Sequence, residues 1–217
     1  MPKEARSPEE VAKVKQTIID ETLDLIAISG YASFTMRKLA SRLNIAAKTI
    51  YNYFENKDEI CIYARERGFG LLYIELLKHY NAHDDPFEKL RAIHHAYVNF
   101  GVNNPDYYNL MFTWHVPRYK EYEGTSLEST ATIEMEVATK IIEMFTTTFE
   151  GIADTYGWID KKEASFYQLQ FYTGAHGIVS TFNNRTLHYM TETPTEVLSA
   201  LTETLLKMIK PHTGIAN

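Results

Sequence analysis

A cluster of small polar and basic side chains between residues 31 and 57 could make hydrogen bonds and ion pairs with a nucleic acid. Lys48, Thr49, Asn52 and Tyr53 remain on a short predicted helix after its apolar positions are set aside. Such side chains donate to phosphate oxygens and to base edges. This window holds five basic residues and one acid, Glu55, whereas the whole chain has a formal net charge of −6. One basic face on an acidic protein fits docking on DNA.

Two short helices joined by a tight turn are predicted to position these side chains. Asn44 stands between the helices, where a turn needs a residue that tolerates positive φ. Each helix has an apolar face. The residues of the two faces are Leu39, Ala40 and Leu43, then Ile45, Ile50 and Phe54. This arrangement is typical of a helix-turn-helix, whose second helix enters the DNA major groove.

Three short segments surround these helices, after a predicted helix from about Pro8 to Ser29 that Gly30 closes. They are FTMRKLA at 34–40, IYNYF at 50–54 and NKDE at 56–59. In these segments, over roughly its first quarter, the chain resembles the TetR family of transcriptional regulators. It departs from the family at Asn44, where Gly is frequent, and at Ala46 and Ala47, where Ser, Thr or a charged residue often stands. The two alanines leave fewer polar groups to contact bases.

The resemblance and the helix positions together predict which residues contact double-stranded operator DNA. Thr35 is expected to cap the first of the two short helices and to present its hydroxyl to a phosphate. The resemblance implies a base or backbone contact for Tyr51 and a phosphate contact for Tyr53. Alternatively, either tyrosine only packs the small head. The predicted DNA-contact residues are Thr35, Arg37, Ala47, Lys48, Thr49, Tyr51, Asn52, Tyr53 and Lys57.

Length and composition bound the class of protein. The chain has 217 residues, of which 45% are hydrophobic, as in an ordinary globular protein. It has no apolar run of about 18 residues and no apolar core near its N-terminus, so neither a membrane span nor a signal peptide is expected. Cys61 is the single cysteine, which excludes an internal disulfide and a cysteine-based zinc site. A cytoplasmic location is expected.

The fold class predicted from the helix start and stop signals is all-α, with about nine helices and no strand. Asn56 with Glu59 forms a capping pair, and Asp85 with Glu88 is a strong start signal. A helix-turn-helix head at residues 1–57 and an effector-binding and dimerisation domain at 58–217 are predicted. In the resembling family the fourth helix links these two domains. The predicted helices cover about 8–29, two short helices between 35 and 54, then 57–80, 86–103, 105–114, 126–154, 160–185 and 194–210.

Aromatic side chains recur along the second part of the chain. The whole chain has 15 Tyr, 11 Phe and 2 Trp. They could form a packed core, but each buried tyrosine hydroxyl would then need a partner. A mixed Phe and Tyr lining with few polar groups is typical of a small-molecule pocket, and the resemblance implies one between the middle helices. The predicted effector-binding residues are Phe100, Tyr108, Phe112, Trp114, Phe145, Phe149, Tyr172 and His176.

The segments 104–112 and 174–178 resemble one effector-domain subgroup of the family. That subgroup often carries Trp shortly before its His-Gly pair, whereas this chain has FYT at 171–173 before His176 and Gly177. His176 could contact a ligand or be a hydrogen-bonded interior histidine. Residues 160–185 are apolar nearly all round, which predicts burial on two sides, one against a second subunit. The predicted dimer-interface residues are Gly174, Gly177, Val197, Leu201, Leu205 and Met208.

The remaining chemistry-bearing residues do not form an active-site or metal-site pattern. His79 and His83 are four residues apart and His94 and His95 are adjacent, but the chain has no HExxH motif or Cys/His zinc spacing. It also has no Gly-rich phosphate loop and no Ser/His/Asp signature. We therefore expect no metal, no cofactor and no catalytic residue.

Taken together, these patterns predict a ligand-responsive, homodimeric DNA-binding regulator without a membrane partner. It is expected to be a repressor that a small apolar or aromatic effector releases from its operator. The alternative is an all-helical small-molecule-binding or enzyme-like protein with a vestigial helix-turn-helix.

Overall fold

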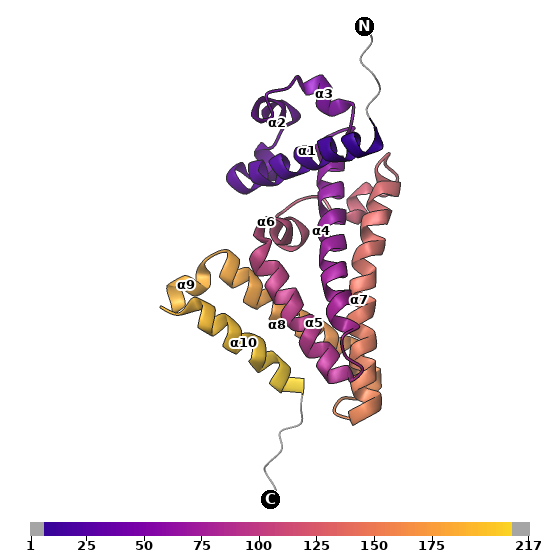
Figure 1. The fold of residues 1–217 in the computed structure, drawn as a ribbon, viewed down its shortest axis with the longest axis vertical. Coiled ribbons are helices and arrows are strands. Elements are labelled where there is room, and N and C mark those ends of the chain that lie inside the picture. The colour runs from indigo at the N-terminus through magenta and orange to yellow at the C-terminus, as the bar shows by residue number, and fades with distance from the viewer. Residues whose placement is uncertain (1–6, 210–217) are drawn as a thin grey trace, which may run out of the picture. The chain divides into compact units, whose positions relative to one another are not determined.

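The computed structural model describes residues 7–209, and within them it contains ten α-helices and no strand (Figure 1). This confirms the predicted all-α class. The one added helix is α9, which follows Arg185 in the left-handed conformation at φ +62°. The helices are α1 Pro8–Ser29, α2 Met36–Arg42, α3 Ala47–Tyr51, α4 Lys57–Tyr80, α5 Pro86–Asn103, α6 Pro105–Tyr108, α7 Glu128–Tyr156, α8 Ala164–Asn183, α9 Thr186–Met190 and α10 Pro194–Ile209.

The helices form two compact units. The first unit holds the described residues up to Phe69 together with Asp106–Glu136, and the second holds Gly70–Pro105 and the residues from Val137 onward. Helices α4 and α7 each contribute one part to each unit. The functional boundary expected between residues 57 and 58 stays a prediction.

Side chains at helix starts explain why the long helices begin where they do. Ser7 and Glu10 form a reciprocal capping box before Pro8. Asn56 Oδ1 accepts from the amides of Asp58 and Glu59 at 2.9 and 3.0 Å. Asp85 caps α5 in the same way, through the amides of Phe87 and Glu88. The predicted start signals at Asn56 and Asp85 are therefore confirmed.

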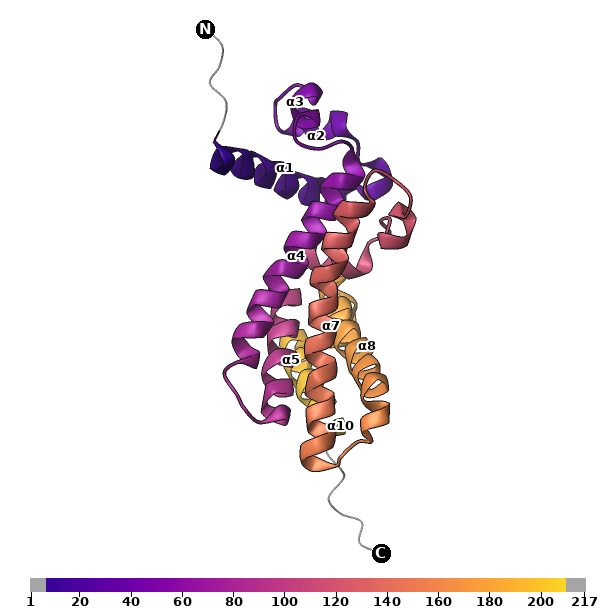
Figure 2. The same cartoon turned by 90° about the vertical axis from the view of Figure 1, so that its right-hand side faces the viewer.

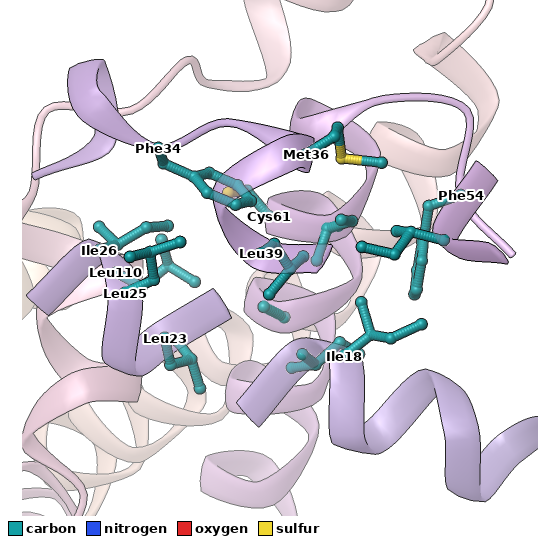
Figure 3. Close-up of a cluster of buried hydrophobic side chains, with 14 of the residues drawn as sticks. Ile18, Leu23, Leu25, Ile26, Phe34, Met36, Leu39, Phe54, Cys61 and Leu110 are labelled. Atoms are coloured by element: carbon teal, nitrogen blue, oxygen red, sulfur yellow. The ribbon is translucent and has the colours of Figure 1, made fainter. Parts of the chain in front are cut away.

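The core of the first unit brings distant segments together (Figure 3). Apolar residues of α1, α2 and α3 converge on Ile60, Cys61 and Ala64 near the start of α4. Leu110 lies beside Leu25 and Ile26 of α1, and it is fully buried. Leu110 follows α6, in a π-helical turn at Asn109–Thr113. The small head is therefore completed by a segment far from it in sequence.

The second unit is built on α5, α8 and α10, which pack against one another. Its apolar core includes Phe87 and Leu90 of α5, Phe149 and Ile152 of α7, and Leu206 of α10. Gly157, at φ +62°, follows directly after the last residue of α7. No helix among residues 7–209 is both long and apolar enough to span a membrane.

Candidate functional site

The turn between α2 and α3 has the geometry that its sequence predicts. Asn44 adopts φ +52°. Thr35 Oγ1 accepts from the amide of Lys38 at 3.2 Å, so Thr35 caps α2. Leu39 and Ile50 are fully buried between the two helices, whereas Ile45 stays 38% exposed at the edge of this face. The apolar side of the helix-turn-helix is thus fixed by packing, and its polar side is left for contact with a partner.

The nine predicted DNA-contact residues lie at or near the surface. Tyr51 is 53% exposed, and the side chains of Thr35, Arg37, Lys48 and Asn52 are also exposed. Those of Ala47, Thr49, Tyr53 and Lys57 are half-buried. Ala47 and Tyr53 pack against the core of the first unit, which gives both a structural role besides any DNA contact.

The basic side chains of this surface differ in whether another residue already binds them. Arg42 binds Glu21 of α1 at 2.9 Å and Asp24 at 3.5 Å. Lys38 donates to the carbonyl of Ser33 at 2.8 Å. In the described part of the chain, Arg37 and Lys48 have no ion pair or side-chain hydrogen bond. These two cations are therefore the freest to neutralise phosphates, a distinction that the sequence does not reveal.

Lys57 is held at the start of α4 by aromatic contacts. Its ammonium lies 4.1 Å from the ring centroid of Tyr31, a cation–π contact. The Tyr31 hydroxyl donates to Asp58, and burial together with this carboxylate raises the pKa of Tyr31. Tyr31 therefore ties the turn after α1 to the start of α4 and orients Lys57 at the head surface.

Three of the eight predicted effector residues lie in the first unit. Tyr108 is fully buried, and its ring lies 4.9 Å from that of Phe112, which also contacts Phe69 at 5.6 Å. Trp114 packs on the head core. Arg118 donates to the carbonyls of Met111 and Trp114 and so anchors the chain after the π-helical turn.

The other five lie in the second unit. Phe149 is fully buried in the core, with Phe145 packed beside it. Tyr172 is 37% exposed, and its ring stacks on that of His176 with centroids 5.9 Å apart. Burial lowers the pKa of His176. That all eight residues line a single pocket stays a prediction.

Phe100 also lines a groove of about 280 Å³ between α4 and α5 in the second unit. The groove is lined by three apolar side chains, three carboxamides and one carboxylate. Its lining residues are Leu71, Glu75, Ala96, Asn99, Phe100, Asn103 and Asn104. The pattern of aromatic side chains in the sequence points to Phe100 but not to the other residues of this groove. The i, i+4 spacing of Asn99 and Asn103 beside Phe100 is the signal that could have pointed to it.

The predicted dimer residues fall into two groups. Gly174 faces Leu205 of the same chain, since a Cβ at Gly174 would come within 2.7 Å of Leu205 Cδ2. Leu201 and Met208 are 39% and 60% exposed, Val197 is half-buried, and no atom of residues 7–209 outside its own helix lies near a Cβ at Gly177. The first pair therefore makes an intramolecular contact, and the second group is open to a partner. Their place in a dimer stays a prediction.

Comparison with known proteins relates both parts of the chain to one family. Residues 18–64 match the family model for bacterial regulatory proteins of the tetR family, and residues 90–205 match the tetracyclin repressor-like C-terminal domain. An uncharacterized HTH-type transcriptional regulator of Haemophilus influenzae is 34% identical over 90 residues, which are 42% of this chain and 48% of that protein. The repressor KstR of Rhodococcus jostii is 36% identical over 55 residues, or 25% of this chain and 26% of that one. The matched segments thus span about half or less of these relatives' own length.

Solved structures extend the similarity to nearly the whole fold. A tetR-family regulatory protein from Rhodococcus RHA1 superposes with a TM-score of 0.71 at 16% identity, covering 91% of this chain and 97% of that one. FadR from Bacillus subtilis, solved in complex with stearoyl-CoA, superposes with a TM-score of 0.68 at 17% identity, covering 92% and 98%. At such identities the likeness concerns the fold alone. The second family model by itself covers more than half of the chain, and the chain therefore belongs to the TetR family of bacterial transcription regulators.

Proposed function

We propose that this protein is a homodimeric repressor that binds a near-palindromic operator and releases it when a small molecule binds. The observation that carries the proposal is the surface of α2 and α3, where Arg37 and Lys48 are exposed cations without a partner among residues 7–209. Two such surfaces related by two-fold symmetry would enter successive major grooves about 34–36 Å apart.

An exposed apolar face on α8 and α10 supports the dimer. Phe166 and Leu169 of α8 are 65% and 56% exposed, and Leu201 and Met208 of α10 are 39% and 60% exposed. Large apolar side chains gathered on neighbouring helices mark a surface that a partner covers. In a two-fold dimer the same face of each subunit would serve both sides of the interface.

The effector is proposed to be a small apolar or aromatic compound that binds in the second part of the chain. The groove at Phe100 has apolar walls for such a compound and carboxamides at Asn99 and Asn103 that could fix its polar end. The FadR structure with stearoyl-CoA supports an apolar ligand, because its fold is similar. The effector can act only through a difference in affinity between the DNA-binding state and the released state.

Footprinting on the DNA upstream of the protein's own gene tests this function. We expect a dimer to protect a near-palindromic sequence. A compound from an apolar and aromatic library that raises the melting temperature of the protein should abolish this protection. A protein that binds this DNA no better than an unrelated fragment of equal length would contradict the DNA-binding proposal. Operator binding that no stabilising compound weakens would contradict only the effector proposal.

A further inference from the structure

A buried ion pair joins α4 to α7 inside the first unit. Arg65 of α4 is 0% exposed, and its guanidinium binds the Glu134 carboxylate through two parallel hydrogen bonds, Nε to Oε1 and Nη2 to Oε2, each 2.8 Å long. Helices α4 and α7 lie side by side here in both views (Figures 1 and 2). A planar, two-point contact of this kind fixes orientation as well as distance.

Apolar contacts can hold α4 and α7 together without the Arg65–Glu134 ion pair. Ile62 of α4 packs with Tyr122, Leu127 and Ala131 in an apolar cluster at the same level, and all four are buried. Apolar residues in place of a buried ion pair are often at least as stabilising, because both charges must be desolvated. What the pair adds is a single permitted alignment, since sliding or turning α4 against α7 would leave two charges buried and unpaired.

The pair also reaches a third element. Nη1 of Arg65 and the hydroxyl of Tyr122 are both buried, and the guanidinium of Arg65 lies close to this hydroxyl. Tyr122 lies in the 3₁₀ turn Tyr119–Tyr122 that precedes α7. Burial raises the pKa of Tyr122 to about 12, and the nearby guanidinium opposes this shift. Arg65 therefore sits where α4, α7 and this turn meet.

We propose that Arg65 and Glu134 are positioning residues for DNA binding, which fix the alignment of α4 and thereby the orientation of the helix-turn-helix. Arg65 lies eight residues, or about 12 Å along the helix, beyond Lys57, where α4 begins directly after the turn that follows α3. Glu55, just before α4, also accepts from the hydroxyl of Ser126 at 3.0 Å, so a second contact ties this turn to the chain entering α7. The inference rests on the proposed DNA-binding function.

Replacing both charges with apolar side chains of similar length separates alignment from stability. In the double variant Arg65→Met/Glu134→Met, we expect a melting temperature equal to or above that of the wild type. Affinity for the protected upstream DNA should fall roughly 5- to 150-fold, the usual size of a coupling between sites. The matched control is Arg67→Met/Glu136→Met, which makes the same changes two residues along each helix, at exposed positions. The control should bind DNA like the wild type.

Two further measurements keep the test decisive. Arg65→Lys keeps the charge but lacks the planar fork, so it should fold and still lose DNA affinity. Hydrogen exchange of the amides at 57–64 in the absence of DNA should be faster in the double variant than in the control. If the double variant folds, DNA affinity and amide hydrogen exchange equal to those of the control would overturn the proposal. If the double variant does not fold, wild-type DNA affinity in Arg65→Lys would overturn it. If the wild type itself binds no DNA, the proposed function fails, and the exchange measurement alone then decides whether the pair aligns α4.

Discussion

His94 of α5 is buried against α10, and its Nε2 donates a hydrogen bond to the backbone carbonyl of Thr202, 3.2 Å away. The imidazole is 1% exposed, and its ring centroid lies 4.6 Å from that of Phe171 of α8. One side chain thus contacts all three helices on which the second unit is built. Because a carbonyl can only accept, Nε2 carries a proton, and in the neutral ring Nδ1 therefore has none.

The stability of the second unit should therefore fall in mild acid. Burial lowers the pKa of His94 to about 4, although the hydrogen bond to Thr202 opposes this shift. In the unfolded chain the His94 imidazole takes up a proton near pH 6.5, whereas in the folded chain it does so only near pH 4. The contribution of the neutral His94 imidazole to the free energy of unfolding is therefore complete above pH 6.5 and is lost as the pH falls from 6.5 towards 4. The full effect is roughly 3 kcal/mol.

Urea denaturation at pH 7 and pH 5, at one protein concentration, measures this loss. His94→Gln keeps a donor for Thr202 but cannot titrate, so its free energy of unfolding should depend less steeply on pH than that of the wild type. His79→Gln is the matched control, since His79 is a half-exposed histidine that binds Glu75. Equal pH dependence in the wild type and His94→Gln would contradict the assignment.

Two glycines of α8 should respond in opposite ways to an added side chain. A Cβ at Gly174 would press against the end of the Leu205 side chain, whereas a Cβ at Gly177 would have no neighbour within 4 Å among the described residues. Gly177→Ala should stabilise the folded chain by up to about 1 kcal/mol through helix propensity. Gly174→Val should destabilise it by about 1–3 kcal/mol, because Leu205 must shift away from its packed position. Thermal unfolding monitored by circular dichroism compares the two, and equal shifts at both sites would refute the packing argument.

How far the sequence predicts this molecule depends on the range of the interactions involved. Asn44, Asn56 and Asp85 act on their own neighbours, so their turn and caps follow from local spacing. The partnership of Arg65 with Glu134 spans 69 positions, and no local pattern marks it. The burial of Leu110 in the head core has the same origin, because only the folded chain brings it to α1. For the same reason, the sequence does not distinguish Arg42, which forms ion pairs with Glu21 and Asp24, from Arg37, which has no ion pair within residues 7–209.

DNA affinity should depend on Lys48 and Thr49, which lie on the polar side of α3. Lys48→Ala and Thr49→Ala should each weaken operator binding by roughly 1–3 kcal/mol, the usual worth of a direct groove contact, without changing helicity. Fluorescence anisotropy with the footprinted DNA measures this loss. Arg67→Ala, an exposed residue of α4, is the control. Unchanged affinity in both variants would mean that a different face meets the DNA.

The salt dependence of the same binding reports on the phosphates that the head neutralises. Arg37 is exposed and has no ion pair within residues 7–209, so Arg37→Ala should reduce the slope of log affinity against log salt. The reduction should be about 0.9 for each phosphate that the variant no longer neutralises. Arg42→Ala should change the slope less, because Glu21 and Asp24 already balance that charge. A flat response to salt in the wild type would argue against any DNA-binding role.

Substitutions at different apolar residues of α10 should affect dimerisation and folding separately. Leu201 and Met208 are exposed, whereas Leu205 packs between Gly174 and the apolar core. Leu201→Glu/Met208→Glu should therefore give a folded monomer, since the carboxylates disrupt only the proposed dimer face. Leu205→Glu should lower the melting temperature of the subunit itself, because its charge would be buried against α8. Sedimentation equilibrium and circular dichroism together tell these outcomes apart. A stable dimer in the Leu201→Glu/Met208→Glu variant would place the interface elsewhere on the chain.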